Sequence, residues 1–238
     1  MRKIFVFLVF ALVLSRPCQA EERVCVVASA PSGAWLIQKN SVVKSTLSAG
    51  DPIYEGDRLV VTQGNAIQLA MDEGFENTLE VQGASDLRFS RGHGVDLTNG
   101  RVYALFNRSP GGEFSINSPV AISATRAAKF QVRASGDKAD VNTYAGEVQV
   151  SGRDASGSPA GDPVIVAAGQ KTSVSPVGQP PQVPSSMAEY EKSEILPVAG
   201  RMDEARRAFS EARRRAQGEP IGGKEFKADE KSKGLVLL

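Results

Sequence analysis

The stretch LSAGDPIYEGDRLVVTQGNAIQLAM, from Leu47 to Met71, decides the fold of this chain. Two Gly-Asp pairs, Gly50-Asp51 and Gly56-Asp57, bracket a short extended piece. Glycine suits turn positions with a positive φ, and an aspartate side chain can accept hydrogen bonds from nearby backbone N–H groups. The stretch therefore predicts two tight turns, followed by two strands that are joined by a third turn at Gln63-Gly64-Asn65.

The last residues of this stretch, AIQLAM, alternate between two kinds of side chain. Leu69 falls on one face with the other large apolar residues, whereas Gln68 falls on the opposite face with two alanines. A period of two is the pattern of a β-strand that has one face in the core. The run therefore predicts a half-buried strand in which Leu69 points inward.

Similar alternation recurs along the chain as far as residue 174. Short apolar runs stand between glycine, asparagine and aspartate residues, and the chain has 23 glycines. This pattern indicates an all-β core, sandwich or barrel-like, with a β-solenoid as the alternative. Phe130 alternates with Gln131, so we expect Phe130 inside. Residues 101–106 are apolar on both faces, which indicates a central strand.

Residues 50–69 carry a resemblance to a known family, since GDPIYEGDRLVVTQGNAIQL is similar to the opening of a FecR-type domain. Later elements of that pattern follow in order: LTNGRV at 97–102, FSINSPVA at 114–121 and YAGEVQV at 144–150. The match covers residues 33–174. The resemblance implies a domain of the kind found in periplasmic signalling regulators and in other exported proteins.

The chain departs from the family pattern at one turn, and its beginning differs from that of the signalling regulators. Where the family usually has Arg-Gly-Thr, this chain has Arg126-Ala127-Ala128, so we expect a different turn there if the glycine needs a positive φ. The regulators also carry a cytoplasmic anti-sigma region and one transmembrane helix. Because the β pattern starts soon after residue 20, the resemblance implies an exported form without the anti-sigma region.

Residues 1–20 have the pattern of a targeting segment. Arg2 and Lys3 precede an apolar run from Ile4 to Leu14 that is too short to span a bilayer comfortably. Small residues end the segment, so we expect a signal peptide that is cleaved after Ala20. The expected location is periplasmic or secreted, with no stable membrane span after cleavage. A retained membrane anchor is the alternative.

The composition changes after residue 176, where we place the end of a β domain that covers residues 21–176. Residues 177–185 are rich in proline and predict a semi-rigid linker. Ser186 and Glu189 have the spacing of a capping box, which predicts a helical segment over 186–217, with Pro197 breaking or restarting the helix. Residues 218–238 are polar and charged, which indicates a disordered tail.

The helical segment carries one apolar stripe with a 3-4-3-4 spacing, including Met202 and Phe209. A surface helix needs a place to bury such a stripe. The stripe can pack back onto the β domain, or it can dock into a partner protein, and the proline-rich linker favours the partner by holding the helix away. The basic run that follows could meet an anionic surface. The candidate partner-binding residues are Met202, Phe209, Arg213 and Arg214.

The sequence offers no catalytic, cofactor-binding or metal-binding residues. The only histidine, His93, lies in a Gly-His-Gly turn, and no nucleophile elbow is present. A zinc site needs several histidine or cysteine ligands, and only His93 and Cys25 remain after cleavage. Asp51, Asp57 and Asp72 lack calcium-binding spacing and suit turns. Cys25 can be a buried strand residue or can form an intermolecular disulfide.

These observations predict a non-enzymatic exported module of the bacterial cell envelope that binds an unidentified envelope protein or assembles into a complex. With 28 basic and 27 acidic residues, the chain offers no general attraction to nucleic acid. The alternative is a module that binds cell-wall or extracellular glycan. That function needs exposed aromatic platforms, and the candidates are Trp35, Tyr54 and Tyr103. It ranks second because aromatic residues are only 6% of the chain.

Overall fold

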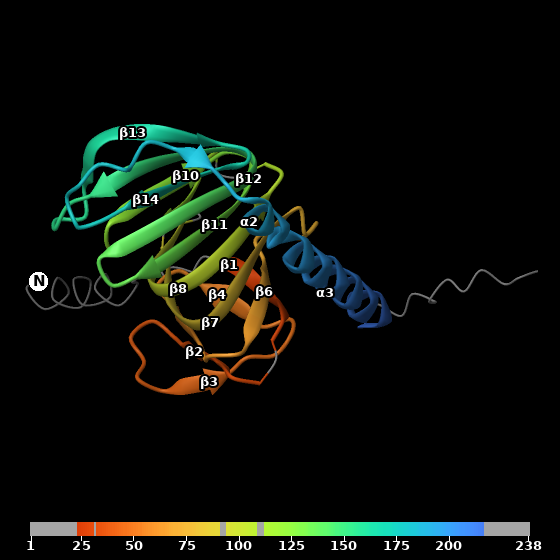
Figure 1. Cartoon of the computed structure of the whole chain (residues 1–238). Coiled ribbons are helices and arrows are strands. Elements are labelled where there is room, and N and C mark those ends of the chain that lie inside the picture. The colour runs from red at the N-terminus through yellow and green to blue at the C-terminus, as the bar shows by residue number, and fades with distance from the viewer. Residues whose placement is uncertain (1–22, 31, 91–93, 109–111, 217–238) are drawn as a thin grey trace, which may run out of the picture.

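The computed structural model describes residues 23–30, 32–90, 94–108 and 112–216. Its strands belong to one hydrogen-bonded network, and two helices follow them (Figure 1). In chain order the elements are β1 (Arg23–Ser29), β2 (Ala34–Ile37), β3 (Lys44–Thr46), β4 (Pro52–Tyr54), β5 (Arg58–Val61), β6 (Ala66–Ala70), β7 (Asn77–Ser90), β8 (Gly94–Phe106), β9 (Phe114–Asn117), β10 (Ala121–Thr125), β11 (Ala128–Ser135), β12 (Lys138–Arg153), β13 (Pro159–Ala167), β14 (Gln170–Val174), β15 (Ser185–Ser186), α2 (Glu189–Ser193) and α3 (Ile195–Ala216).

Three long strands, β7, β8 and β12, each run through both layers of this network. In the first layer the order is β4, β1, β6, the first half of β7, the second half of β8, β11, the first half of β12, β14 and β15. In the second it is β3, β2, β5, the other halves of β7 and β8, β9, β10, the second half of β12 and β13. The predicted all-β core followed by a helix is confirmed.

The long strands change layers at residues with a positive φ. Gly100 in β8 has φ 111° and Gly146 in β12 has φ 75°, while Ala84 in β7, with φ 55°, lies in a stretch where the register shifts. Such interruptions bend a strand and re-aim its side chains. An added Cβ at Gly146 would overlap the carbonyl oxygen of Ala127. The Ala127-Ala128 turn therefore depends on a glycine in the neighbouring strand.

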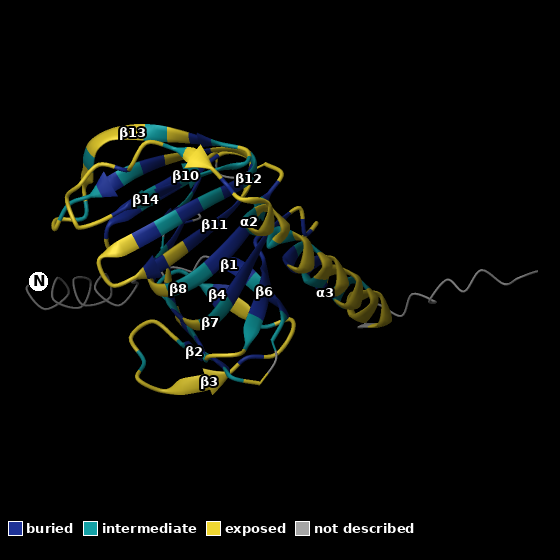
Figure 2. Ribbon diagram, in the orientation of Figure 1, coloured by how far each residue is buried: buried dark blue, intermediate teal, exposed yellow. Residues whose placement is uncertain are grey.

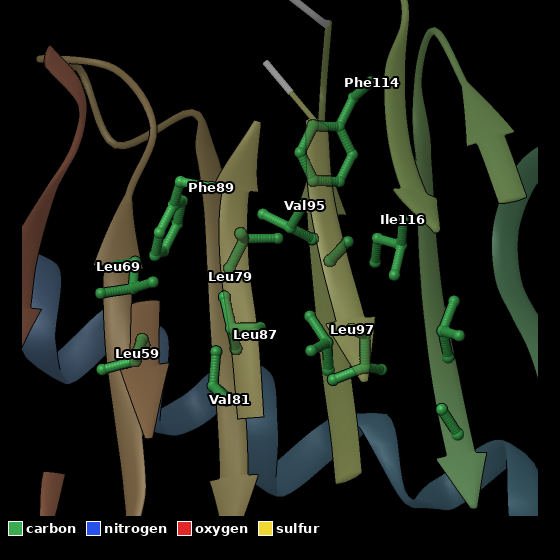
Figure 3. Close-up of a cluster of buried hydrophobic side chains, with 14 of the residues drawn as sticks. Leu59, Leu69, Leu79, Val81, Leu87, Phe89, Val95, Leu97, Phe114 and Ile116 are labelled. Atoms are coloured by element: carbon green, nitrogen blue, oxygen red, sulfur yellow. The ribbon is translucent and has the colours of Figure 1, made fainter. Parts of the chain in front are cut away.

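The main apolar core lies between the two layers. Leu69 and Phe130 are fully buried there, so both inward assignments are confirmed. Figure 3 shows Leu69 of β6 and Leu79 of β7 on the side of the first layer that faces away from the helix ribbon. In Figure 2 the buried residues lie along the inner strands, whereas β3 and most of β13 are exposed. The expected central strand at 101–106 is also confirmed, because the second half of β8 pairs with both β7 and β11.

The prediction that β6 is only half buried is wrong. Gln68 on its outer face is 7% exposed, and Gln131 on the outer face of β11 is 5% exposed. The physical reason is that α3 covers this face. Alternation within a strand shows which face is apolar and which is polar. It does not show whether a helix from elsewhere in the chain covers the polar face.

The segment that leads to the helices lies against β14. The Gln182 N–H donates to the Ser173 carbonyl oxygen at 2.9 Å, and β15 pairs with β14. The prediction that Ser186 caps the helix is wrong, because Ser186 belongs to β15. Instead, the Glu191 carboxylate accepts a hydrogen bond from the N–H of Ala188, the residue before α2, at 2.7 Å. The chain then restarts as α3, with Pro197 in its first turn, where proline is tolerated.

Candidate functional site

A row of polar side chains crosses the outer face of the first layer, one from each of six neighbouring strands. Consecutive members are register partners, so the row runs perpendicular to the strands. We call it the polar row, and its members are Gln68, Glu80, Tyr103, Gln131, Asn142 and Lys171.

The helices make three polar contacts along the polar row. Lys171 Nζ lies 2.7 Å from a Glu191 carboxylate oxygen, and the Tyr103 hydroxyl donates to the Glu194 carboxylate at 3.4 Å. At the other end, the Arg201 guanidinium donates to Glu80. Glu191 lies in α2, Glu194 lies between the two helices and Arg201 lies in α3, so each part of the helical segment contributes one of the contacts. The helical segment is therefore held over the sheet by its own charged residues.

Glu80 is the most enclosed charged group in this contact, with 0% exposure. Its carboxylate accepts hydrogen bonds from Gln68 Nε2 at 3.1 Å, from Gln82 Nε2 at 2.7 Å and from Arg201 Nε at 3.0 Å. A second guanidinium nitrogen of Arg201 also donates to it. A buried carboxylate is tolerated only when its charge and its lone pairs are matched in this way. Arg201 therefore compensates a charge on the face of the sheet that α3 covers.

Apolar contacts hold the helix on both sides of Arg201. Val198 and Met202 are 1% and 5% exposed and pack with Tyr103. Further along α3, Ala205 and Phe209 pack with Phe75, whose ring centroid lies 4.9 Å from that of Phe209; Ala28 and Ala70 complete this cluster. The first half of the predicted stripe is therefore buried against the chain itself.

The structure separates the four predicted partner-binding residues. Met202 lies beneath the helix, where its sulfur accepts a hydrogen bond from the Thr78 hydroxyl at 3.1 Å. Phe209 is half-buried, and Arg213 lies 3.8 Å from the Glu73 carboxylate with half of its side chain exposed. Arg214 is exposed. Phe209 and Arg213 border a hollow of about 480 Å³, which we call the Phe209 hollow.

Of the aromatic side chains considered for glycan binding, Tyr103 is buried and Trp35 is partly exposed. Tyr103 is 2% exposed, and burial raises the pKa of its hydroxyl. Burial likewise raises the pKa of Tyr144, whose ring centroid lies 6.4 Å from that of Tyr103. Trp35 is half-buried, with the ammonium nitrogen of Lys44 5.5 Å from its ring centroid. Tyr103 is thus a packing residue beneath the helix.

The three aspartates weighed as calcium ligands bind backbone N–H groups. Asp57 accepts from Lys39 at 2.9 Å and from Tyr54 at 3.0 Å. Asp51 and Asp72 do the same in their own turns, with Ser48 and with Asn77. Within the described residues, no group of histidine, cysteine, aspartate or glutamate side chains has the arrangement of a metal site.

A second hollow, of about 650 Å³, lies beside the helix where β7 and β8 change layers. Its wall includes three guanidinium groups, those of Arg101, Arg133 and Arg201, so we call it the arginine hollow. Sequence reasoning did not find this cluster. The residues come from three separate segments, and only the register, which pairs Arg101 with Arg133, brings two of them side by side.

Residues 57–149 match the family model described as FecR protein. The chain contains a FecR domain. The matched region runs from the start of β5 into β12, so the FecR domain supplies the long layer-changing strands and most of the polar row. The resemblance seen in the sequence is confirmed.

Two crystal structures of a candidate anti-sigma factor from Parabacteroides distasonis are similar to part of this FecR-domain chain. One has 15% sequence identity and a TM-score of 0.46, and the other has 14% identity and a TM-score of 0.47. Each likeness covers 58% of this chain and 64% or 63% of the other. The chain thus spans less than two thirds of the structures that it matches. No curated protein matches it. Among the described residues, neither helix combines the length and the apolar character that a membrane crossing requires.

Proposed function

We propose that this chain is a non-enzymatic exported FecR-domain protein that binds another protein of the bacterial cell envelope, as a signalling or assembly module. The observation that carries the proposal is the FecR match over residues 57–149. By resemblance, such domains occur in periplasmic signalling regulators and in other exported proteins. The targeting pattern of residues 1–20 supports export to the periplasm or beyond it; these residues lie outside those that the structure describes.

The partner-binding surface in this proposal is the second half of α3 together with the Phe209 hollow. Phe209 and Arg213 border that hollow, and Arg214 is exposed next to them. The hollow combines an apolar wall, which includes Phe75, with charged groups at its edge. Such a combination suits an apolar anchor of a partner surrounded by polar contacts. Met202 contributes indirectly, because its burial fixes the helix on the sheet.

Covalent capture in living cells tests this function. A tagged chain is cross-linked in the intact envelope, purified under denaturing conditions and compared with the variant Arg213→Glu/Arg214→Glu. Both residues are exposed, so we expect the variant to fold and to lose its cross-linked partner. The control, Arg126→Glu/Lys129→Glu, reverses two exposed charges of the β domain. Equal cross-linking by all three chains would contradict this surface, and no partner for the unaltered chain would contradict the function.

The second candidate function is binding of cell-wall or extracellular glycan. Trp35 supports it, because this residue is only half-buried and Val42 and Val43 in the adjacent loop are 93% and 70% exposed. Trp35→Ala would then abolish co-sedimentation with insoluble peptidoglycan while leaving the cross-linked protein partner in place. Unchanged co-sedimentation would remove this candidate.

A further inference from the structure

The arginine hollow combines positive charge with groups that can pair with a peptide backbone. Arg101 and Arg133 belong to the sheet, and Arg201 reaches the hollow from α3. Gln63, Asn65, Gln82 and Asn99 also line the hollow. The amide nitrogens of Asn65, Gln82 and Asn99 donate to Thr62, Glu80 and Ala84, which leaves the amide oxygens as acceptors. No carboxylate and no aromatic ring lines the hollow among the described residues.

Arg101 and Arg133 are direct register partners on β8 and β11. Both project from the outer face, because the residues that alternate with them, Val102 and Val132, are fully buried in the core. Like charges that lie directly opposite each other on neighbouring strands destabilise a sheet. The pair is therefore a cost to the fold unless something anionic lies between or above the two guanidiniums.

The acidic side chains nearest in the sheet are already engaged. Glu80, one row away, accepts hydrogen bonds from Arg201 and two glutamines. Asp140, the register partner of Arg133 on β12, lies 2.9 Å from Lys138 Nζ and accepts a hydrogen bond from the Ser173 hydroxyl at 2.6 Å. Within the described residues, no carboxylate lies within 4.0 Å of the guanidinium nitrogens of Arg101 or Arg133. Within that part of the chain, Arg101 is hydrogen-bonded to the Tyr103 hydroxyl, and neither arginine has a carboxylate partner.

We propose that the arginine hollow binds an acidic peptide segment of the partner protein, with its carboxylates on Arg101 and Arg133. This inference rests on the proposed function, since it names the chemistry of one partner segment. Guanidinium groups pair with carboxylates through two parallel hydrogen bonds, and the amide oxygens of the wall can accept hydrogen bonds from peptide N–H groups. An acidic glycan fits less well, because a sugar ring is usually held against an aromatic face and this wall has none.

Fluorescence anisotropy with a defined probe tests the proposal. The probe is a short fluorescein-labelled peptide of glycine, aspartate and glutamate, and its counterpart has asparagine and glutamine instead. We expect saturable binding of the acidic probe only, weakened by added salt. The variant Arg101→Gln/Arg133→Gln should bind the probe about tenfold more weakly, or not at all, because both charge-assisted contacts are lost.

A charge-matched control separates a local site from general attraction. Arg206→Gln/Arg207→Gln removes two exposed guanidiniums from α3, so it lowers the net charge equally. It should bind the probe as the unaltered chain does. The proposal would be overturned by equal weakening in both double variants or by a lack of saturable binding. It would also be overturned if polygalacturonate or inorganic phosphate displaced the probe at a lower concentration than unlabelled acidic peptide does.

Thermal unfolding shows whether the arginines serve the fold instead. Relief of the repulsion predicts an unchanged or higher Tm for the double variant and for Arg133→Gln alone, whose side chain is exposed. A clear fall in Tm for Arg133→Gln would overturn the assignment. Cross-linking in the envelope then distinguishes the two proposals. If the Arg101→Gln/Arg133→Gln chain keeps a partner that the unaltered chain also captures, the hollow fails as a site and the function stands.

Discussion

Arg201 in α3 donates two hydrogen bonds to the carboxylate of Glu80 in β7, across 121 positions of sequence. Glu80 is fully buried, whereas 41% of the Arg201 side chain is exposed. The ion pair therefore joins the FecR domain to the helical segment that follows it. The helix that covers Glu80 thus also supplies the cation for its carboxylate.

Replacement of Arg201 by methionine tests this ion pair. We expect a loss of about 3 kcal/mol in the free energy of unfolding, since breaking a buried pair leaves an uncompensated charge. The double variant Glu80→Met/Arg201→Met should recover at least half of that loss, and Arg206→Met on the exposed face should change little. Urea unfolding measures all three. A double variant as unstable as Arg201→Met would show that the charge is not the cause.

Met202 tests whether the stripe serves the chain's own fold. Met202→Ala removes a side chain that is 5% exposed, and we expect a loss of about 2 kcal/mol. Ala212→Asp, in the exposed half of the same stripe, should cost less than about 0.5 kcal/mol. If the two changes had equal effects on the urea midpoint, the helix would not be docked through its first half.

Gly146 is the position at which substitution should strain the fold most directly. Gly146→Ala combines a φ of 75° with overlap on Ala127, and we expect a loss of more than about 2 kcal/mol. The matched control is Gly136→Ala, which has a φ of 60° but open space around the added Cβ, so it should cost about 1 kcal/mol. Comparison of the two Tm values isolates the steric contribution, and equal values would refute it.

Cys25 should be unreactive in the native protein. It is 2% exposed, and burial raises the pKa of its thiol above the ordinary range, with a further increase from Asp57. A thiol reagent at pH 8 should therefore label the protein only in denaturant. Because the native state holds this proton more tightly, stability should fall as pH rises above about 8.5, and less so in Cys25→Ala. Rapid labelling of the native protein would show that Cys25 is accessible, and an intermolecular disulfide would again have to be considered.

Export stays a prediction that protein chemistry can check. Cleavage after Ala20 would give a mature chain that begins Glu21-Glu22-Arg23. N-terminal sequencing of protein from the envelope fraction should read these residues. An intact Met1 in that fraction would indicate a retained anchor instead.

Much of the β domain could be predicted from the sequence because its signals are local. The alternation around Leu69 and Phe130 identified core residues, since successive side chains of a strand always point to opposite faces. The apolar character of both faces of residues 101–106 identified a central strand. The order of the FecR-like elements identified the family, which the match over residues 57–149 confirms.

The candidate sites could not be predicted because they depend on register and docking. Nothing local to Gln68, Glu80 or Gln131 distinguishes a polar face in water from one that lies beneath a helix. Nothing in the sequence of the proline-rich segment shows that the Gln182 N–H donates a hydrogen bond to Ser173 of β14. This contact directs the chain back along the sheet, so that α3 can pack on it.

The sequence by itself determined where most strands of the β domain lie and which of their faces is apolar, since both follow from the period of two and from side-chain chemistry. Only the tertiary structure decided that Arg101 stands opposite Arg133 and that Arg201 reaches Glu80. The physical reason is that these pairings join residues far apart in the chain. They are selected by the summed free energy of the whole packed arrangement, which cannot be read from any single segment.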